Sequence, residues 1–315
     1  MFSFLKRKLG GDRSLGVSFH QDGVSMALAA KNPQHEIVLE HLEYQSVSDT
    51  DDMPAALKKM VSKAGFKGIP TTFVMEPTHY SLMQVESPEV ADDELKNAVR
   101  WRVKDLIDFH IDDAVIDIIS LPSSKRVGAP KLMYVIATRT SFIESTVEQL
   151  ESAGLSINAI DVAELSLRNM TFADTQENRA NAFLYLSKNM SLIEICDNGS
   201  LCLSRHISIN VDDLDESSTG NRSDMMDMLS LEVQRSLDYY ESQYASGAAS
   251  ELNFVSQCSL SVDEFSEVAG SYLTVPIKNL SALEKIKGID GYDADLVTSC
   301  LPTIGASIRD FAWTN

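Results

Sequence analysis

The side chains that could bind a metal or attack a substrate are spread along the chain without the spacing that such chemistry needs. The six histidines show no metal-binding pattern; they are His20, His35, His41, His79, His110 and His206. No CxxC pair occurs among the four cysteines, Cys196, Cys202, Cys258 and Cys300, so a zinc site is not predicted. Combinations of serine, histidine and aspartate lack a nucleophile-elbow signature. We therefore predict no metal and no catalytic residue.

One acidic cluster invites a catalytic interpretation. The segment FHIDDAVID, residues 109–117, holds Asp112, Asp113 and Asp117. Paired carboxylates serve general acid–base catalysis where their surroundings set their pKa values apart. This segment, however, is typical of a turn that leads into a strand, where acidic side chains are ordinarily solvated. We interpret it as an exposed turn and strand edge.

A polar turn between two apolar strands raises a sharper question. The segment is RSLGVSFHQDGVSMALAA, residues 13–30, and its alternation predicts two strands. Such a turn either cradles a phosphate with its backbone N–H groups or only joins the strands. The answer separates an ATP-using protein from a scaffold of the same shape.

Length and composition predict a globular chain of about two domains. The 315 residues are 44% hydrophobic and 23% charged, which is ordinary for a chain that buries a core. The net charge of -19 argues against nucleic-acid binding, because that binding depends on Lys and Arg displacing counterions. No run of ~20 apolar residues predicts a membrane span, and no apolar stretch predicts a secretory signal. We expect a cytoplasmic protein.

The first ten residues, MFSFLKRKLG, are a local exception to the acidity. Their apolar and basic side chains are Phe2, Phe4, Leu5, Lys6, Arg7 and Lys8. Segments of this kind rest on anionic membrane surfaces and gain roughly 1 kcal/mol per basic residue near the headgroups. A solvated terminus explains the same residues equally well, so both interpretations stay open.

The two halves of the chain predict the same order of elements, β-β-β-α-β. In the first half, apolar runs and turn signals predict strands at about 14–20, 24–30, 36–43 and 71–76, with a helix that ends at Gly65 before the last strand. In the second half, they predict strands at about 182–187, 191–196, 201–207 and 251–256, with a helix at about 224–245 before the last. This repetition indicates an old structural duplication. A further module lies between the halves, and its last helix is predicted to start at a capping box, Ser141 to Glu144.

Three segments resemble PilM-type pilus-assembly proteins. They are AVRWRVKDLIDFHIDDAVIDI (98–118), IATRTSFIESTVEQLESAGLSINAIDVAELSLRNM (136–170) and LSLEVQRSLDYYESQ (229–243). The resemblance covers most of the chain in the right order, and it is nearest to the PilM-like component of the mannose-sensitive haemagglutinin (MSHA) pilus system. Related folds occur in the cell-division protein FtsA and in the cytoplasmic part of the type II secretion L protein.

This resemblance implies a two-lobed α/β fold, the actin-like (ribonuclease H-like) ATPase fold of the FtsA/PilM type, with a 1C-like module inserted in the first lobe. The boundaries that we assign are 1–79 for the first lobe, 80–160 for the inserted module, 161–180 for an inter-lobe helix and linker, and 181–299 for the second lobe. A C-terminal helix, 300–315, is expected to pack back onto the first lobe.

The resemblance also implies where a nucleotide would bind, and the motifs there are eroded. In the family's first turn, Gly-Ile-Asp-Ile-Gly-Ser-Ser, the Asp and turn Gly positions match Ser18 and His20, and Gln21 and Asp22 replace small residues. The second turn and the adenosine-binding element match this chain at Leu184, Leu186, Lys188, Ser256, Gln257, Cys258 and Ser259. Of these, Leu184 takes the place of the metal-directed Asp, and Leu186 takes that of the close-approach Gly.

A side chain in place of glycine blocks the close approach of a phosphate to the backbone. We therefore expect no bound cofactor and interpret the chain as a pseudo-ATPase. The alternative is an active switch that binds ATP with magnesium, in pilus assembly or in type II secretion. In that alternative Lys188 would meet a phosphate as a point charge.

A partner is implied as well: the short cytoplasmic tail of a bitopic inner-membrane protein of the PilN type, bound between the base of the first lobe and the inserted module. The residues at the matching positions are Trp101, Arg102, Leu106, Phe109 and Ile111. Tryptophan and arginine are typical anchors of interfaces, although packing of Trp101 in the core of the module is an equally good explanation. We expect a scaffold that is peripheral at the inner membrane.

Overall fold

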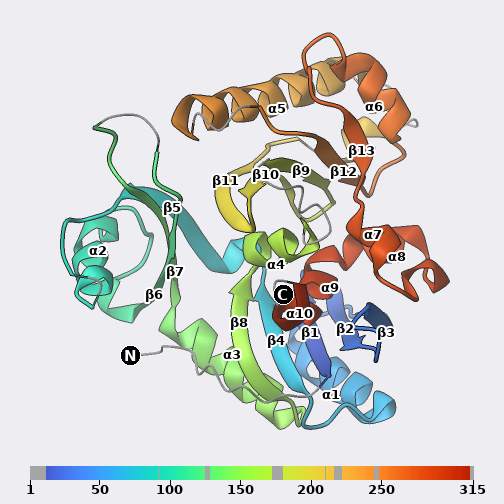
Figure 1. Cartoon of the computed structure of the whole chain (residues 1–315). Coiled ribbons are helices and arrows are strands. Elements are labelled where there is room, and N and C mark those ends of the chain that lie inside the picture. The colour runs from blue at the N-terminus through green and yellow to red at the C-terminus, as the bar shows by residue number, and fades with distance from the viewer. Residues whose placement is uncertain are drawn as a thin grey trace.

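The computed structural model describes residues 12–91, 93–124, 128–171, 180–209, 211–215, 222–244 and 248–312. The chain forms two lobes, each built on a five-stranded sheet, and a smaller module with a three-stranded sheet at one side (Figure 1). Residues Phe2 to Lys8, for which a membrane contact or a solvated terminus was expected, lie outside the described residues.

The sheet of the first lobe has the strand order β3-β2-β1-β4-β8. Its strands are β1 (Arg13–His20), β2 (Gly23–Lys31), β3 (Ile37–Ser46), β4 (Pro70–Met75) and β8 (Ser156–Val162). The first three strands are antiparallel, and β1, β4 and β8 are parallel. Helix α1 (Met53–Ala64) buries Leu57 and Val61 and ends at Gly65, whose φ of 74° is left-handed. The predicted strands and helix of this half are confirmed.

The second lobe repeats this topology, with the strand order β11-β10-β9-β12-β13. Its strands are β9 (Asn181–Leu186), β10 (Ser191–Asp197), β11 (Ser200–His206), β12 (Leu252–Ser256) and β13 (Ile277–Asn279). Helices α5 (Arg222–Tyr244) and α6 (Val262–Ala269) cover one face of it. The predicted apolar stripe of α5, from Leu229 to Tyr244, is buried. The matching strand orders of the two sheets support the duplication that the sequence indicates.

The inserted module leaves the first lobe after β4 and returns to it at β8. Its elements are β5 (Tyr80–Glu86), α2 (Leu95–Val103), β6 (Ala114–Ser120), β7 (Leu132–Arg139) and α3 (Thr140–Ser152). The capping-box prediction is wrong: α3 begins at Thr140, directly after β7, with Arg139 as its N-cap and no side-chain cap bond. Strand β8 starts before residue 160, so the chain rejoins the first sheet earlier than the boundary that we assigned.

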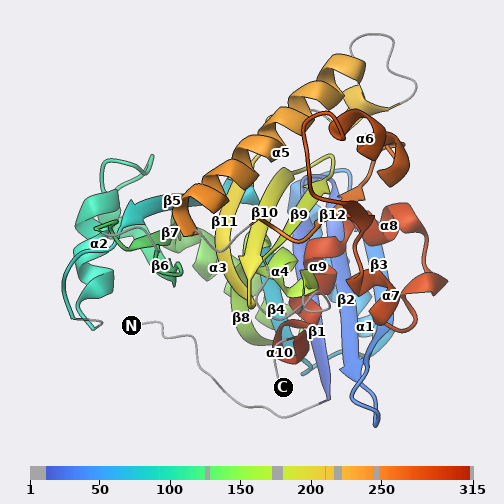
Figure 2. The same ribbon diagram turned by 45° about the horizontal axis from the view of Figure 1, so that its top comes forward.

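Two helices lie between the sheets and join the lobes (Figure 2). They are α4 (Ala163–Asn169) and α9 (Leu301–Ser307). A Cβ on Gly16 of β1 would lie 2.0 Å from the carbonyl oxygen of Thr303, and a Cβ on Gly305 would lie 2.0 Å from that of Ser166. The backbones of β1, α9 and α4 are therefore in direct contact, which glycine alone permits.

The segment before α9 differs from its expected place. It holds α7 (Ala282–Lys285) and α8 (Ala294–Ser299), and α10 (Arg309–Ala312) follows α9. We assigned residues up to 299 to the second lobe, yet the N–H of Lys287 donates to the carbonyl oxygen of Ile37, and the N–H of Leu39 donates to that of Lys287, both at 2.9 Å. Residues near 287 thus extend the edge of the first sheet.

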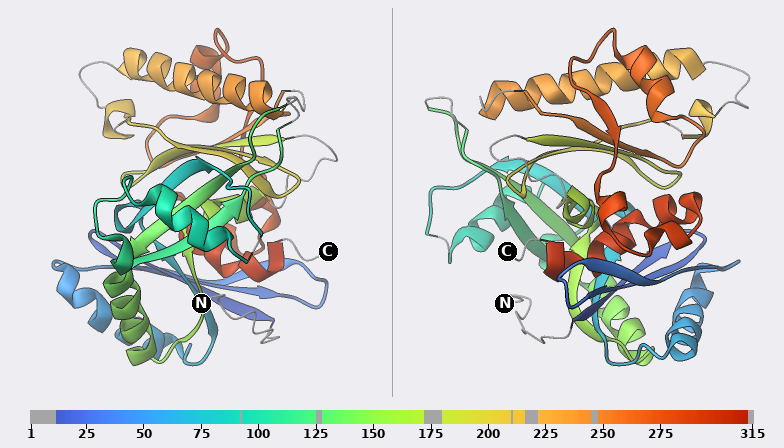
Figure 3. Two further views of the ribbon diagram at one scale, coloured as in Figure 1. Left: turned by 90° about the vertical axis from the view of Figure 1, so that its left-hand side faces the viewer. Right: turned by 45° about the vertical axis from the view of Figure 1, so that its right-hand side comes forward.

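The inserted module also touches the second lobe (Figure 3). The hydroxyl of Tyr134 on β7 accepts from the N–H of Ser204 at 2.9 Å and lies 3.2 Å from its carbonyl oxygen. Around it, Leu121 and Tyr134 form a buried apolar cluster with Cys196 and Leu201 of the second lobe. The module therefore bridges both lobes.

Candidate functional site

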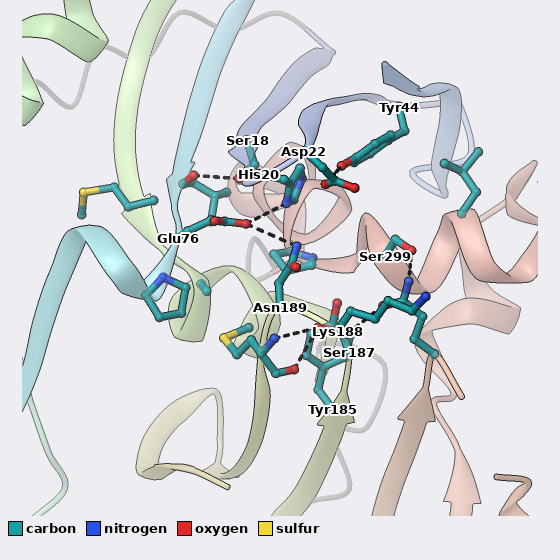
Figure 4. Close-up of a pocket in the computed structure, with 18 of the residues that line it drawn as sticks. Ser18, His20, Asp22, Tyr44, Glu76, Tyr185, Ser187, Lys188, Asn189 and Ser299 are labelled. Atoms are coloured by element: carbon teal, nitrogen blue, oxygen red, sulfur yellow. Dashed lines mark hydrogen bonds and ion pairs between the residues drawn. The ribbon is translucent and has the colours of Figure 1, made fainter. Parts of the chain in front are cut away.

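A cleft of about 310 Å³ opens between the two lobes. The carboxyl end of β4 and the β1–β2 turn form one wall, and the turn after β9 forms the other (Figure 4). Ligands of α/β proteins bind at such carboxyl ends. The polar residues that line the cleft are Ser18, His20, Asp22, Tyr44, Glu76, Tyr185, Ser187, Lys188, Asn189, Gln257, Asp295 and Ser299.

The wall from the first lobe is held by a chain of hydrogen bonds. Nδ1 of His20 lies 3.0 Å from Oε1 of Glu76, and Nε2 lies 2.7 Å from Oγ of Ser25. The Ser25 hydroxyl in turn lies 2.6 Å from Oγ1 of Thr303 on α9. A carboxylate only accepts, so the bond to Glu76 assigns the proton to Nδ1 and leaves Nε2 to accept from Ser25. The side chain of His20 therefore fills the position of the turn glycine.

This serine, histidine and glutamate have the hydrogen-bond order of a catalytic triad. The side chain of Ser25 is nevertheless 0% exposed and is absent from the cleft lining. A nucleophile needs room for a substrate carbonyl beside its oxygen. The arrangement can order the β1–β2 hairpin, and it cannot perform acyl transfer.

The tip of the first turn places a carboxylate at the cleft. The hydroxyl of Tyr44 on β3 donates to the carboxylate of Asp22. Burial and this acidic neighbour both raise the pKa of the Tyr44 hydroxyl. Gln21 is exposed and does not line the cleft. A phosphate at this turn would face the negative charge of Asp22.

Two backbone N–H groups of the second turn donate to other groups of the protein. The N–H of Lys188 donates to Oε1 of Gln257 at 3.0 Å, and the N–H of Met190 donates to Oγ of Ser187 at 3.1 Å. Gln257 also donates to Oγ of Ser299 at 2.9 Å. The amide of Gln257 therefore occupies the place that a phosphate oxygen would take at Lys188.

A direct contact crosses the cleft. Nδ2 of Asn189, in the second turn, donates to Oε1 of Glu76 at 3.5 Å, so the lobes meet through side chains between the two turns (Figure 4). The sequence reasoning missed both residues. Glu76 could have been found, because it is the last residue of the predicted strand 71–76, at the edge where α/β sheets bind ligands.

The assignment of Leu184 to the metal-directed position needs correction. Leu184 and Leu186 belong to the core beneath α5, whereas Tyr185 faces the cleft and donates to the carbonyl oxygen of Thr298 at 2.8 Å. Successive side chains of a strand point to opposite faces, so the match is shifted by one residue. Tyr185, and not Leu184, is therefore the side chain of β9 that faces the cleft, and it supplies no carboxylate there.

Of the third element, only Gln257 reaches the cleft. Oγ of Ser256 lies 2.8 Å from Sγ of Cys258, and the N–H of Ser259 donates to Asp215 at 2.8 Å. The first contact lies within the turn, and the second ties the turn to the segment that holds Asp215.

The cleft lacks the acids that the resemblance implies for a magnesium–nucleotide complex. No carboxylate stands at Ser18 or Tyr185, where the family's metal-directed acids would face the cleft, and Ser18 donates instead to the carbonyl oxygen of Val74 at 2.9 Å. The cleft lining combines three carboxylates, Asp22, Glu76 and Asp295, with one lysine. A polyphosphate would meet net negative charge there.

The residues predicted to bind a partner lie on the inserted module and differ in accessibility. Trp101 is 71% exposed and Leu106 is 59% exposed, so packing of Trp101 in the core is ruled out. Arg102 is exposed and donates from Nη1 to the carbonyl oxygen of Glu86 at 3.1 Å. The ring of Phe109 lies 4.6 Å beneath the guanidinium of Arg139. Ile111 is only 5% exposed and packs inside the module, which corrects its place among the contact residues.

Other chemistry is sparse in the part of the chain that the structure describes. No three His, Cys, Asp or Glu side chains there gather closely enough to hold a metal ion. The four cysteines are free, and burial raises the pKa of the Cys202 and Cys300 thiols to about 12. Asp112 and Asp113 are exposed, as their interpretation as a solvated turn requires. Every described helix is too short or too polar to cross a membrane.

Comparison with solved structures identifies the fold. A PilM-PilN type IV pilus biogenesis complex matches at 15% identity with a TM-score of 0.68, over 96% of this chain and 99% of that one. A Bacteroides thetaiotaomicron protein of actin-like ATPase fold and unknown function matches at 13% identity with a TM-score of 0.51, over 95% and 99%. The cytoplasmic domain of EpsL, an inner membrane component of the type II secretion system of Vibrio cholerae, has a TM-score of 0.48 at 11% identity, over 82% and 94%. The predicted actin-like fold is confirmed.

Sequence comparison gives the family. No curated protein matches the chain by sequence. The profile described as Type IV pilus assembly protein PilM matches residues 28–217. Because this range is more than half of the 315 residues, the chain belongs to the PilM family of type IV pilus assembly proteins.

Proposed function

We propose that this protein is a non-catalytic scaffold of type IV pilus assembly. In this proposal it works at the cytoplasmic face of the inner membrane, where it binds the cytoplasmic tail of a bitopic, PilN-like protein. The observation that carries the non-catalytic part is the contact of Gln257 with the N–H of Lys188. Together with the Asn189–Glu76 contact, it occupies with protein groups two of the donors at the cleft that could otherwise meet a nucleotide.

The proposal that the protein binds a cytoplasmic tail rests on its family and on the surface of the inserted module. Trp101, Arg102 and Leu106 present an exposed aromatic ring, a guanidinium and an aliphatic side chain on or just after α2. Large side chains with few rotatable bonds make strong anchors when a partner buries them. We assign the tail to this surface, and we assign the pilus to the MSHA type, with MshI as the corresponding component, from the resemblance of segments 98–118 and 229–243.

Calorimetric titration tests both parts. The full chain is titrated with ATP and Mg²⁺, and separately with a synthetic peptide of the candidate partner's cytoplasmic tail. We expect no heat of nucleotide binding and saturable binding of the peptide. Micromolar nucleotide binding would instead favour the alternative, an ATP-dependent switch, and absence of peptide binding would remove the partner assignment.

Two matched variants make the nucleotide titration more specific. Gln257→Ala removes the amide that occupies the Lys188 N–H, and Gln243→Ala makes the same change at the end of α5, away from the cleft. Neither variant should bind nucleotide, because no acid faces the cleft at Ser18 or Tyr185. Nucleotide binding by Gln257→Ala alone would show that one side chain closes an otherwise competent site.

A further inference from the structure

A buried polar cluster lies where α4 and the inserted module pack against the second lobe. Glu194 is the fourth residue of β10 and is 0% exposed. Its neighbours on the same face of the strand are Leu192, which packs with α4, and Cys196, which packs with Leu121 and Tyr134 of the module. The carboxyl group of Glu194 therefore points into the contact between these three parts of the molecule.

No hydrogen bond of good geometry reaches either oxygen of this carboxyl group from the described residues. Ser204 stands directly opposite on β11, and its hydroxyl is near enough to lower the pKa of this carboxyl group, although the pair makes no hydrogen bond of good geometry. Nε of Arg168 on α4 is buried and unpaired as well, while Nη2 of Arg168 donates to Asn169 at 3.3 Å. Buried polar groups normally have well-formed partners, so three groups without a hydrogen bond of good geometry in one contact indicate an arrangement with a second position available to it.

The neighbouring carboxylate is fully engaged. Glu164 of α4 is 0% exposed and accepts from the hydroxyl of Tyr80 at 2.5 Å and from Nε2 of His206 at 3.1 Å. It thus ties β5 of the module and β11 of the second lobe to α4. A second negative charge at Glu194 would face this carboxylate in a dry environment.

We propose that Glu194 is a protonation-controlled latch: its neutral carboxylic acid permits the inserted module and α4 to pack on the second lobe, and its ionisation loosens that contact. The ionised group would be drawn toward the guanidinium of Arg168, and this movement disturbs the packing around Tyr134 and Ser204.

The charges around Glu194 agree with a neutral resting state. Burial, and then the charge of Glu164, raise the pKa of Glu194 well above its ordinary value, and Arg168 and the hydroxyl of Ser204 oppose them. The other titratable groups that face it are Tyr80 on β5, Tyr134 on β7 and Cys196 on its own strand. Burial raises the pKa of each of these three groups as well, so each stays neutral and offers no compensating cation. His206 acts on the cluster through Glu164.

Hydrogen exchange of the full chain tests the latch without any partner or nucleotide. Amide exchange in β7 and β11 is followed from about pH 6 to pH 9 and corrected for the intrinsic chemical rate. In the wild type, protection is expected to fall with rising pH, by up to about tenfold per pH unit for one released proton. Glu194→Gln, which stays neutral, should keep its protection over the whole range. The control Glu241→Gln, at an exposed position of α5, should behave as the wild type does.

The inference is overturned if wild-type protection is constant over this range, or if Glu194→Gln loses protection in parallel with the wild type. Should Glu194→Gln not fold, Arg168→Gln provides the second test. Removing this cation raises the pKa of the closed form further, so the fall in protection should continue to a higher pH before it levels off than it does in the wild type. An unshifted profile in Arg168→Gln would contradict the latch.

Discussion

Nε2 of His20 lies 2.7 Å from the hydroxyl oxygen of Ser25, in the geometry of a base and its nucleophile, at a depth that no substrate reaches. Where a turn glycine would admit a phosphate, the chain places an imidazole, and the imidazole is anchored through Ser25 to α9. These hydrogen bonds connect the β1–β2 hairpin of the first sheet to the helix beneath it.

Replacing this serine should lower stability. In Ser25→Ala, Nε2 of His20 and the hydroxyl of Thr303 lose their shared partner inside the protein. A buried group left without its hydrogen bond costs about 1–3 kcal/mol. Urea unfolding measures the change, and Ser48→Ala, at an exposed position, is the control and should stay within about 0.5 kcal/mol of the wild type. Equal stability of the two variants would show that the hydrogen bonds of Ser25 contribute nothing to the free energy of unfolding.

The contact of β1 with α9 predicts a contrast between two glycines. In Gly16→Ala the new Cβ would lie 2.0 Å from a backbone oxygen, and backbone cannot move as a side chain can. We expect a loss of about 3 kcal/mol or more, or failure to fold. Gly291→Ala has open space around its Cβ and should unfold at nearly the wild-type denaturant concentration. Similar midpoints for the two variants would contradict the close approach.

Much of the frame could be predicted from the sequence because alternation and helical periodicity are local signals. The strands β1, β2, β9 and β10 and the buried stripe of α5 follow from such patterns. Two features of the structure could not be predicted from the sequence. Leu184, Tyr185 and Leu186 are all apolar or aromatic and all buried, so alternation cannot say which side chain faces the cleft. The pairing of Lys287 with β3 joins residues about 250 positions apart, and no local pattern carries that information.

The ion pair between Arg222 and Glu264 predicts a pH-dependent contribution to stability. Nη2 of Arg222 donates to Oε2 of Glu264 at 2.8 Å, a second contact makes the pair bidentate, and these bonds lower the pKa of Glu264. A lowered folded-state pKa gives stability that is complete above the unfolded pKa of a glutamate and is lost as pH falls through the folded value. Because the pair lies at the surface, Glu264→Gln should cost up to about 1 kcal/mol near pH 7 and almost nothing in acid.

Urea unfolding at several pH values checks this. Glu232→Gln removes a carboxylate that pairs with Arg235 and with Arg205, both at the surface, and such surface pairs contribute about 0–1 kcal/mol each. A constant cost of Glu264→Gln at all pH values would mean that packing, and not the charge, accounts for its effect.

Salt should weaken binding of the proposed partner tail. The chain carries a net charge of -19, and cytoplasmic segments next to membrane spans are enriched in Lys and Arg. Opposite charges speed association, and salt screens them over a Debye length of about 10 Å at 0.1 M. We expect the tail affinity measured by calorimetry to fall steadily between about 0.05 and 0.5 M NaCl. An affinity that rises with salt would indicate that apolar contacts alone hold the tail.

The exposed tryptophan of the inserted module gives the most direct test of the partner surface. Trp101 is 71% exposed, so Trp101→Ala removes little packing and should leave the unfolding midpoint unchanged. If the tail buries this ring, truncation should cost at least about 2 kcal/mol of binding free energy, which is roughly a 30-fold rise in Kd. Met228→Ala truncates another exposed apolar side chain, 49% exposed on α5 of the second lobe, and should leave the Kd unaltered. Equal affinities for the wild type and Trp101→Ala would place the tail elsewhere, whereas equal losses in both variants would point to a general effect of surface truncation.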